Sequence, residues 1–318
     1  MNPWQAYSRF RWWHEAAIAV MLVGLLVVAG WLMPTFLKLE SQLVLSRQLW
    51  ELAIVTLGMT LIVITGGIDL SVGSTMGLCA VVFGICFSAT QSLALACTAS
   101  LIAGLACGSL NGVLISKFQL HPLIITLATF AAFRGIAEGI SQGAAYSKFG
   151  AAFGQVARGS FGGIPYAGFL FAGLAIVLGV FLAKTSHGRF IYAMGHNETA
   201  ARFAGVAVDR CKFWLYTLSG VLAGLSTIIY VSRFDTARAD AGKGLELDAI
   251  TAVVVGGTSI FGGRGNIIGS VLGLLLIHET RLFVSRYWQI DELRSIVIGI
   301  LLIVSVLLYR GLERKSRD

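Results

Sequence analysis

Apolar residues follow one another in long runs along most of the chain, and short polar or glycine-rich stretches separate these runs. The strict alternation of a transmembrane β-barrel is absent, and a continuous apolar run in lipid needs the internal hydrogen bonding of a helix. A helix needs about 20 residues to cross a bilayer, and shorter pieces are allowed beside glycines. The pattern predicts ten apolar segments, near residues 16–37, 52–65, 72–90, 93–115, 123–140, 166–184, 213–232, 248–260, 267–284 and 293–309.

The composition supports this interpretation. The 318 residues are 56% hydrophobic and only 13% charged, with a mean hydropathy of +0.80. No single soluble core could absorb so much apolar surface, so a soluble globular protein is excluded. The sequence predicts an all-α, polytopic integral membrane protein of about ten transmembrane helices, forming one transmembrane domain over residues 1–318.

The net charge of +8 comes from basic residues in short loops and at the C-terminal tail. Such a distribution follows the rule that cytoplasmic loops of membrane proteins are enriched in Lys and Arg, so membrane lipid is expected around the chain and nucleic acid is not expected as a partner. The loop near 184–212 carries five basic residues, Lys184, Arg189, Arg202, Arg210 and Lys212. We therefore predict that this loop and both termini are cytoplasmic, which an even number of spans permits.

Two glycine-rich breaks interrupt the apolar segments. Residues 66–74 can be laid on residues 262–270, because both stretches begin with Gly-Gly and end with Gly-Ser. Paired breaks of this kind in two halves of a transporter point to discontinuous helices beside a translocation path. Chance similarity is the alternative in a chain with 38 glycines. The candidates for the path or the break are Gly66, Gly67, Asp69, Ser71, Gly73, Asn111, Arg134 and Glu138.

Asp69 is the most informative of these candidates, because a carboxylate at the centre of a membrane helix costs about 2.5–3.5 kcal/mol unless it is paired, capped or hydrated. We favour a structural role, in which Asp69 or Ser71 accepts the free backbone N–H groups that open the next helix. A direct role in gating or substrate passage and a role in proton relay are the alternatives. Asp69→Asn separates these readings, since Asn caps a helix but does not titrate.

Arg134 and Glu138 lie four residues apart in the segment near 123–140 and therefore share one helix face. Residues at this spacing can neutralise each other, and we favour such an ion pair near the outer boundary of the membrane. The alternative is that both line a hydrophilic path, since ionisable groups inside a membrane usually serve a function. Three glycines, Gly104, Gly108 and Gly112, share another helix face and predict close helix packing.

The loop near 184–212 contains a short predicted helix. Residues 198–203 are rich in helix formers, and Asn197 is placed to cap them. Ala200, Ala201 and Ala204 give this helix a smooth side that would fit a groove on another protein. A plain solvated connector is the alternative.

The chain contains no G-x-x-x-x-G-K-[ST] phosphate-binding motif. It is therefore not expected to bind a nucleotide by that device, and ATP-driven transport would need a partner subunit that hydrolyses ATP. Nucleophile elbows, H-E-x-x-H helices and Cys-x-x-Cys pairs are also missing, which argues against an enzyme. No cofactor or metal is expected on this chain.

Three spaced blocks resemble the permeases of sugar-type ABC importers of the ribose permease family. They are Gly66-Gly-Ile-Asp-Leu-Ser-Val-Gly73, the stretch from Gly188-Arg through Ala201 to Gly205, and Leu247-Asp-Ala-Ile-Thr-Ala-Val-Val-Val-Gly-Gly-Thr-Ser-Ile-Phe-Gly-Gly-Arg-Gly265. The resemblance implies a bacterial inner-membrane importer subunit that works with a second permease copy or paralogue, a cytoplasmic ATPase and a periplasmic sugar-binding protein. It implies that the ATPase is contacted by Gly188, Arg189, Tyr192, Gly195, Asn197, Ala200, Ala201 and Gly205.

The resemblance leaves the sugar open, because residues 232–242 are as similar to relatives handling rhamnose or the sugar-derived autoinducer as to those handling ribose. Another class of protein, a stand-alone ion-coupled secondary transporter or channel, would need ionisable groups inside the membrane. Asp69, Arg134 and Glu138 are the only candidates for such groups.

Overall fold

The computed structural model describes residues 3–288, 293, 296–297, 299–300 and 303, with side chains from His14 onward. Helices account for nearly all of the regular structure in this part of the chain. The helices are α1 Pro3–Leu32, α2 Leu39–Leu45, α3 Trp50–Ile64, α4 Val72–Thr90, α5 Leu93–Ser116, α6 Pro122–Ser141, α7 Ala151–Arg158, α8 Tyr166–Lys184, α9 Ser186–His196, α10 Glu198–Phe203, α11 Val208–Phe234, α12 Leu245–Val255 and α13 Ile267–Trp288, with a 3₁₀ turn η1 at Ser46–Gln48.

Two small antiparallel strand pairs are the exception to the predicted all-α fold. The first pairs β1 (Tyr146–Ser147) with β4 (Thr236–Ala237), and the second pairs β2 (Ser160–Phe161) with β3 (Ile164–Pro165). Each strand has only two residues, so these pairs fasten loops together and do not form a sheet that could carry a domain.

Among the described residues, seven helices are long and apolar enough to cross a membrane, and a bent pair formed by Leu39–Gln48 and Trp50–Ile64 would make an eighth. The chain is therefore a polytopic helical membrane protein. Each of the first nine predicted segments contains a helix, but those predicted at 52–65 and 248–260 hold the 15-residue α3 and the 11-residue α12. Both are shorter than the roughly 20 residues that cross a bilayer alone. Most of the tenth segment, 293–309, lies outside the described residues.

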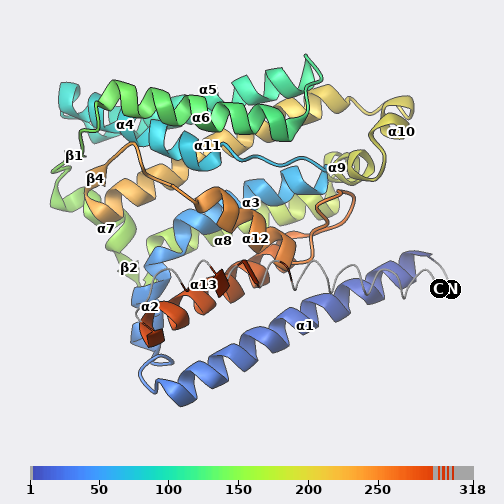
Figure 1. Ribbon diagram of the computed structural model, residues 1–318, viewed down its shortest axis with the longest axis horizontal. Helices are drawn as coiled ribbons and strands as arrows, with labels where there is room; N and C mark the ends of the chain where they lie inside the picture. Colours follow the sequence, from blue (N-terminus) through green and yellow to red (C-terminus); the bar gives the residue numbers. More distant parts are fainter. Residues whose placement is uncertain (1–2, 289–292, 294–295, 298, 301–302, 304–318) are drawn as a thin grey trace.

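The long helices lie lengthwise beside one another, with α5 and α6 along one side of the molecule and α1 along the other (Figure 1). The segment containing α9 and α10 lies at one end, and the paired strands β1 and β4 lie at the opposite end (Figure 1). The basic loop near 184–212 therefore lies at the opposite end of the molecule from β1 and β4.

Helix α3 lies in the interior, since every residue from Glu51 to Ile64 is buried. Helix α5 packs closely along α11 through the predicted glycine face. A Cβ added to Gly104 or Gly108 would overlap the carbonyl oxygen of Gly220 or Tyr216, and one on Gly112 would come within 2.8 Å of the carbonyl oxygen of Phe213. The predicted role of these glycines in close helix packing is confirmed, because any larger residue would separate the two backbones.

The chain leaves the helical conformation at 65–71, between α3 and α4, and at 256–266, between α12 and α13. We call these stretches the first and second break, and we count Ile64, the last residue of α3, with the first break. Gly66, Gly262 and Gly263 have φ angles of 80°, 85° and 76°, which non-glycine residues rarely adopt. The breaks contact each other, because the backbone N–H of Gly263 donates to the carbonyl oxygen of Ile64 over 2.8 Å.

Candidate functional site

Helix α10 begins where the sequence predicts. The side-chain oxygen of Asn197 accepts the backbone N–H of Ala200 over 2.9 Å, and the helix covers Glu198–Phe203. This confirms both the cap and the short helix. The preceding helix α9 is capped in the same way, by the hydroxyl of Thr185, which accepts the N–H of Gly188 over 3.1 Å.

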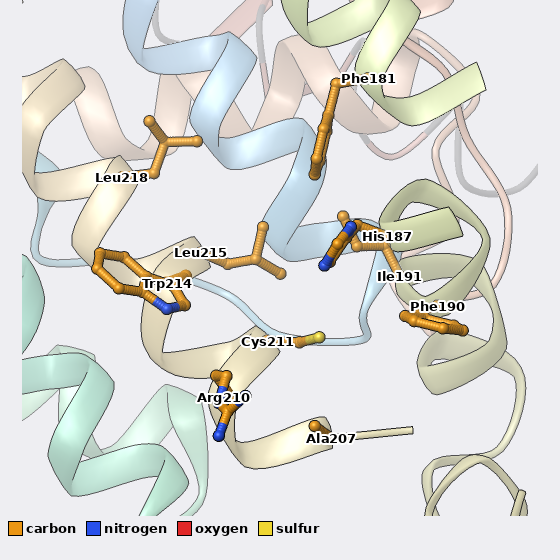
Figure 2. Close-up of a pocket in the computed structure, with 10 residues that line it drawn as sticks. All are labelled: Phe181, His187, Phe190, Ile191, Ala207, Arg210, Cys211, Trp214, Leu215 and Leu218. Atoms are coloured by element: carbon orange, nitrogen blue, oxygen red, sulfur yellow. The ribbon is translucent and has the colours of Figure 1, made fainter. Parts of the chain in front are cut away.

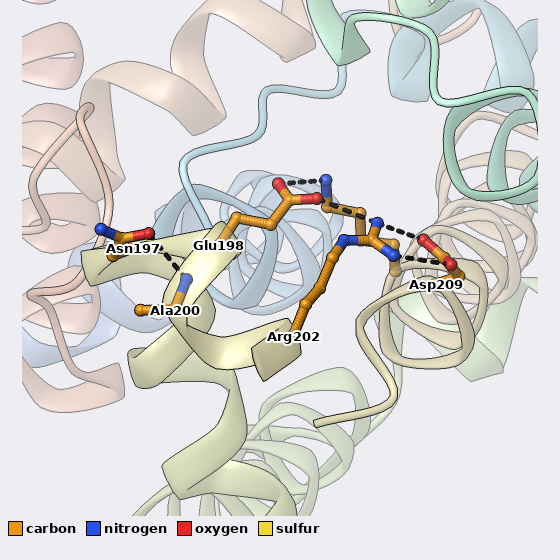
Figure 3. Close-up of polar contacts among 6 residues, drawn as sticks. Asn197, Glu198, Ala200, Arg202 and Asp209 are labelled. Atoms are coloured by element: carbon orange, nitrogen blue, oxygen red, sulfur yellow. Dashed lines mark hydrogen bonds and ion pairs between the residues drawn. The ribbon is translucent and has the colours of Figure 1, made fainter. Parts of the chain in front are cut away.

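A network of ion pairs fixes α10 to the beginning of α11 (Figure 3). Arg202 donates to Glu198 over 3.2 Å and to Asp209 over 2.9 Å, and the Lys212 ammonium lies 2.6 Å from Glu198. Partial burial on its own would raise the pKa of Glu198, but the hydrogen bonds from Lys212 and Arg202 outweigh it and hold that pKa below the usual value for Glu. The two carboxylates and two cations therefore join α10 and α11 into one unit.

The exposed side of α10 differs from the predicted one. Ala200 and Ala204 are exposed as expected, but Ala201 is only 5% exposed and belongs to the main apolar core. Ala201 follows Glu198 by three residues, so it lies on the side that the ion pairs turn toward α11. The predicted contact between Ala201 and a partner is therefore wrong. Phe203, which the sequence analysis overlooked, is 89% exposed.

Helix α9 contacts both breaks. A Cβ added to Gly195 would overlap the carbonyl oxygen of Ile64 and the backbone nitrogen of Gly263. The hydroxyl of Tyr192 donates to the carbonyl oxygen of Gly265 over 2.7 Å. Because these contacts involve backbone atoms, a displacement of α9 would act directly on the breaks.

The remaining predicted residues of this loop differ in their surroundings. A Cβ on Gly188 would overlap the carbonyl oxygen of Leu182, so glycine permits the tight turn from α8 into α9. Gly205 has a φ of 83° and ends the turn after α10. Arg189 is exposed. Together with α9 and α10, these residues form what we call the α9–α10 segment, residues 186–207.

A buried polar cluster lies at the first break. One carboxylate oxygen of Asp69 accepts the N–H and the hydroxyl of Ser71, over 3.0 and 2.7 Å, and the other accepts the hydroxyl of Ser219 over 2.9 Å. The side-chain amide of Asn111 donates to the Ser71 hydroxyl over 2.8 Å. Asp69 thus accepts the N–H of Ser71, the residue before α4, and Ser71 makes no side-chain cap bond to the helix. The predicted cap is therefore not formed, and the carboxylate instead holds the turn that leads into α4.

This cluster brings together residues that are distant in sequence, and each is at most 3% exposed. Asp69, Ser71 and Asn111 were predicted, whereas Ser219 was missed. Its only sequence signal is its place as a polar residue in the apolar segment 213–232. Gly67 belongs to the same region, since a Cβ there would lie 2.6 Å from the Tyr216 hydroxyl oxygen.

Arg134 contacts a different part of the molecule. Its guanidinium donates to the carbonyl oxygens of Ala239 and Ala241, in the loop between α11 and α12, and to that of Gly73 in α4. In the described part of the chain it makes no ion pair with Glu138, which is exposed, so the predicted pair is not formed. Spacing along one helix shows that two residues can meet, but it cannot reveal carbonyl groups that a distant loop supplies.

The described residues contain no group of three or more His, Cys, Asp and Glu side chains that could hold a metal ion. The site instead consists of backbone breaks, a buried hydrogen-bonded carboxylate and a helical segment that contacts both breaks. These features suit a conformational change better than bond-making chemistry.

Residues 43–306 match the family described as branched-chain amino acid transport system / permease component. The chain belongs to this family. It is 33% identical to the Autoinducer 2 import system permease protein LsrD of Salmonella typhimurium over 312 residues, covering 96% of this chain and 92% of that protein. It is 35% identical to LsrD of Photorhabdus temperata over 305 residues, covering 94% and 91% of the two chains.

The chain is also 39% identical to the Ribose import permease protein RbsC of Bacillus subtilis over 294 residues, covering 90% of this chain and 89% of that protein. No solved structure matches it. The predicted membership in the importer permeases is confirmed, and the chain is a transport component rather than an enzyme. Importers of this kind include an ATPase and a substrate-binding protein, and the stand-alone transporter is not favoured.

Proposed function

We propose that this permease imports a monosaccharide or a sugar-like small molecule, with energy from ATP hydrolysed by a cytoplasmic partner. The relatives named as ribose and autoinducer 2 permeases support this substrate class over the amino acids in the family's description. The chain itself carries no nucleotide motif, so it binds no cofactor in this scheme.

The observation that carries the coupling role is the position of the α9–α10 segment. Ion pairs hold α10 to α11 on one side, Phe203 is exposed on the other, and Gly195 and Tyr192 of α9 contact both breaks. A partner protein that binds α10 and moves would therefore displace α9 with it, and so the backbone of the breaks. An exposed aromatic side chain on a firmly held helix is also suited to fill a pocket on a partner.

The proposed path lies beside the breaks. Backbone polar groups at membrane depth need partners when the helix is interrupted, and the Asp69 cluster supplies some of them at the start of α4. Movement of α9 would change the contact between Ile64 and Gly263 and so shift α3 and α12 relative to each other. We infer that this shift alternately closes and opens the passage.

The proposed assembly places the chain in the bacterial inner membrane, with both termini and the α9–α10 segment in the cytoplasm. The basic residues of the loop near 184–212 support this orientation. A second permease copy or paralogue completes the passage, and a periplasmic sugar-binding protein delivers the substrate to the end that carries β1 and β4.

Co-purification of the ATPase tests the coupling role. Phe203→Ser should reduce the amount of ATPase recovered with the permease and the uptake of sugar, because the exposed ring would no longer fill a partner pocket. Phe161→Ser is the matched control, since Phe161 is 74% exposed but lies in β2, away from the α9–α10 segment. Equal recovery of the ATPase with both variants would contradict the proposal.

A further inference from the structure

A pocket of about 290 Å³ lies between the end of α8, the helix α9 and the first half of α11 (Figure 2). Phe181, His187 and Phe190 form one wall. The imidazole of His187 stacks on Phe181 with ring centroids 6.4 Å apart and meets Phe190 edge-on at 6.0 Å. The opposite wall comes from one face of α11.

That face of α11 changes in polarity along the helix. Arg210, Trp214 and Leu218 all line the pocket and follow one another at four-residue intervals, so they lie in a row. The row runs from a cation through an indole to an aliphatic side chain. Because α11 enters the membrane from the α9–α10 segment, the row also runs from the predicted cytoplasmic surface toward the hydrocarbon.

Arg210 lines the pocket and is not used by the ion-pair network. Arg202 and Lys212 are bound to Glu198 and Asp209, whereas Arg210 is exposed and makes no ion pair within the described residues. Trp214 is 61% exposed, and Trp is typical of the level where lipid headgroups meet hydrocarbon. The open end of the pocket is therefore positive, and its interior is apolar.

We propose that this pocket binds one anionic phospholipid of the cytoplasmic leaflet. Arg210 binds the phosphate, the indole of Trp214 lies at the glycerol level, and the upper part of an acyl chain fills the space between Leu218 and Phe181. The pocket volume is near the lower limit of about 300 Å³ for ligand pockets, so it holds part of the lipid while the remaining chain stays in the bilayer. The match of charge and polarity along one helix face identifies the ligand class.

The site has a structural consequence. The lipid would touch α9 and α11 together, and α9 is the helix that contacts both breaks. Lipid in the pocket would therefore support the position of α9 relative to α11, in addition to the ion pairs of α10. This inference does not depend on which sugar is transported or on how the ATPase binds.

Native mass spectrometry of the delipidated, full-length permease tests the proposal with phosphatidylglycerol and phosphatidylcholine as probes. The unmodified protein should bind phosphatidylglycerol more tightly. Arg210→Gln should weaken that binding about five-fold, the effect of one basic residue near an anionic lipid surface, and should leave phosphatidylcholine binding unchanged. Lys117→Gln is the matched control, because it removes an exposed positive charge outside the pocket.

Equal binding of the two lipids, or an Arg210→Gln variant that binds phosphatidylglycerol normally, would overturn the proposal. A photoreactive phenylalanine analogue at position 218 provides a second test in native membranes. A crosslink to phospholipid is expected. A crosslink to a polypeptide would instead assign the pocket to a partner subunit. Unchanged thermal unfolding of each variant shows that the fold is retained.

Discussion

Gly195 of α9 lies directly against Gly263 of the second break, with no room for a methyl group between the two backbones. The same methyl group would overlap the carbonyl oxygen of Ile64, the last residue of α3. One glycine in the α9–α10 segment thus contacts the end of one helix and the break that precedes another. We propose this contact as the route by which the α9–α10 segment acts on the interior of the protein.

Gly195→Ala should impair transport more than it impairs folding. The added methyl group would push α9 away from Ile64 and Gly263, at a cost of about 1–3 kcal/mol for overfilling a packed site. Uptake of radiolabelled sugar, normalised to the amount of inserted permease, measures the effect. Gly173→Ala should retain normal uptake, since Gly173 of α8 is exposed and has no atom within 4 Å of its added Cβ. Normal uptake by Gly195→Ala would rule out this contact as the route of coupling.

Ala200→Glu and Ala201→Glu should fail in different ways. Ala200 is exposed, so the larger side chain should leave the permease folded and reduce recovery of the ATPase. Ala201 is in the apolar core, and burying an unpaired carboxylate there should lower the amount of folded permease. Thermal unfolding and ATPase co-purification, measured on both variants, separate the two outcomes. An Ala201→Glu variant as stable as the unmodified protein would show that Ala201 is accessible.

Asp69→Asn should be tolerated, whereas Asp69→Ala should not. The Asn oxygen can still accept the N–H of Ser71, and the Ser219 hydroxyl can turn to accept from the new amide group. Alanine would remove the acceptor of three buried donors, the N–H and hydroxyl of Ser71 and the hydroxyl of Ser219, and a buried donor left unpaired costs about 1–3 kcal/mol. Uptake and thermal unfolding are the measurements. An Asn variant that assembles but does not transport would favour a titrating role for this carboxylate.

The predicted orientation can be checked by cysteine labelling. Thr199 is exposed on α10 and does not cap it, so a single cysteine at this position in a Cys-free background should not disturb the helix. An impermeant thiol reagent added to intact cells should leave this cysteine unmodified and should label it after the cells are opened. Labelling in intact cells would place the α9–α10 segment outside the cytoplasm.

The sequence by itself determined the features that depend on neighbouring residues. Long apolar runs identified the membrane helices, because a run of that length in lipid has to satisfy its own hydrogen bonds. Asn197 and the helix formers after it located α10, since capping acts within one turn. Gly104, Gly108 and Gly112 identified a close-packing face, although not the helix that it meets.

The tertiary structure decided the features that depend on residues far apart in the chain. Ser219 reaches Asp69 across 150 positions, and Arg134 reaches Ala239 across 105. The burial of Ala201 depends on ion pairs to α11, and the contact between Gly195 and Gly263 depends on two loops meeting. Local pattern fixes which residues form a helix and which faces can pack. Only the folded chain sets which of the possible partners lies opposite each polar group, because each buried donor or acceptor takes whatever partner the packing brings within reach.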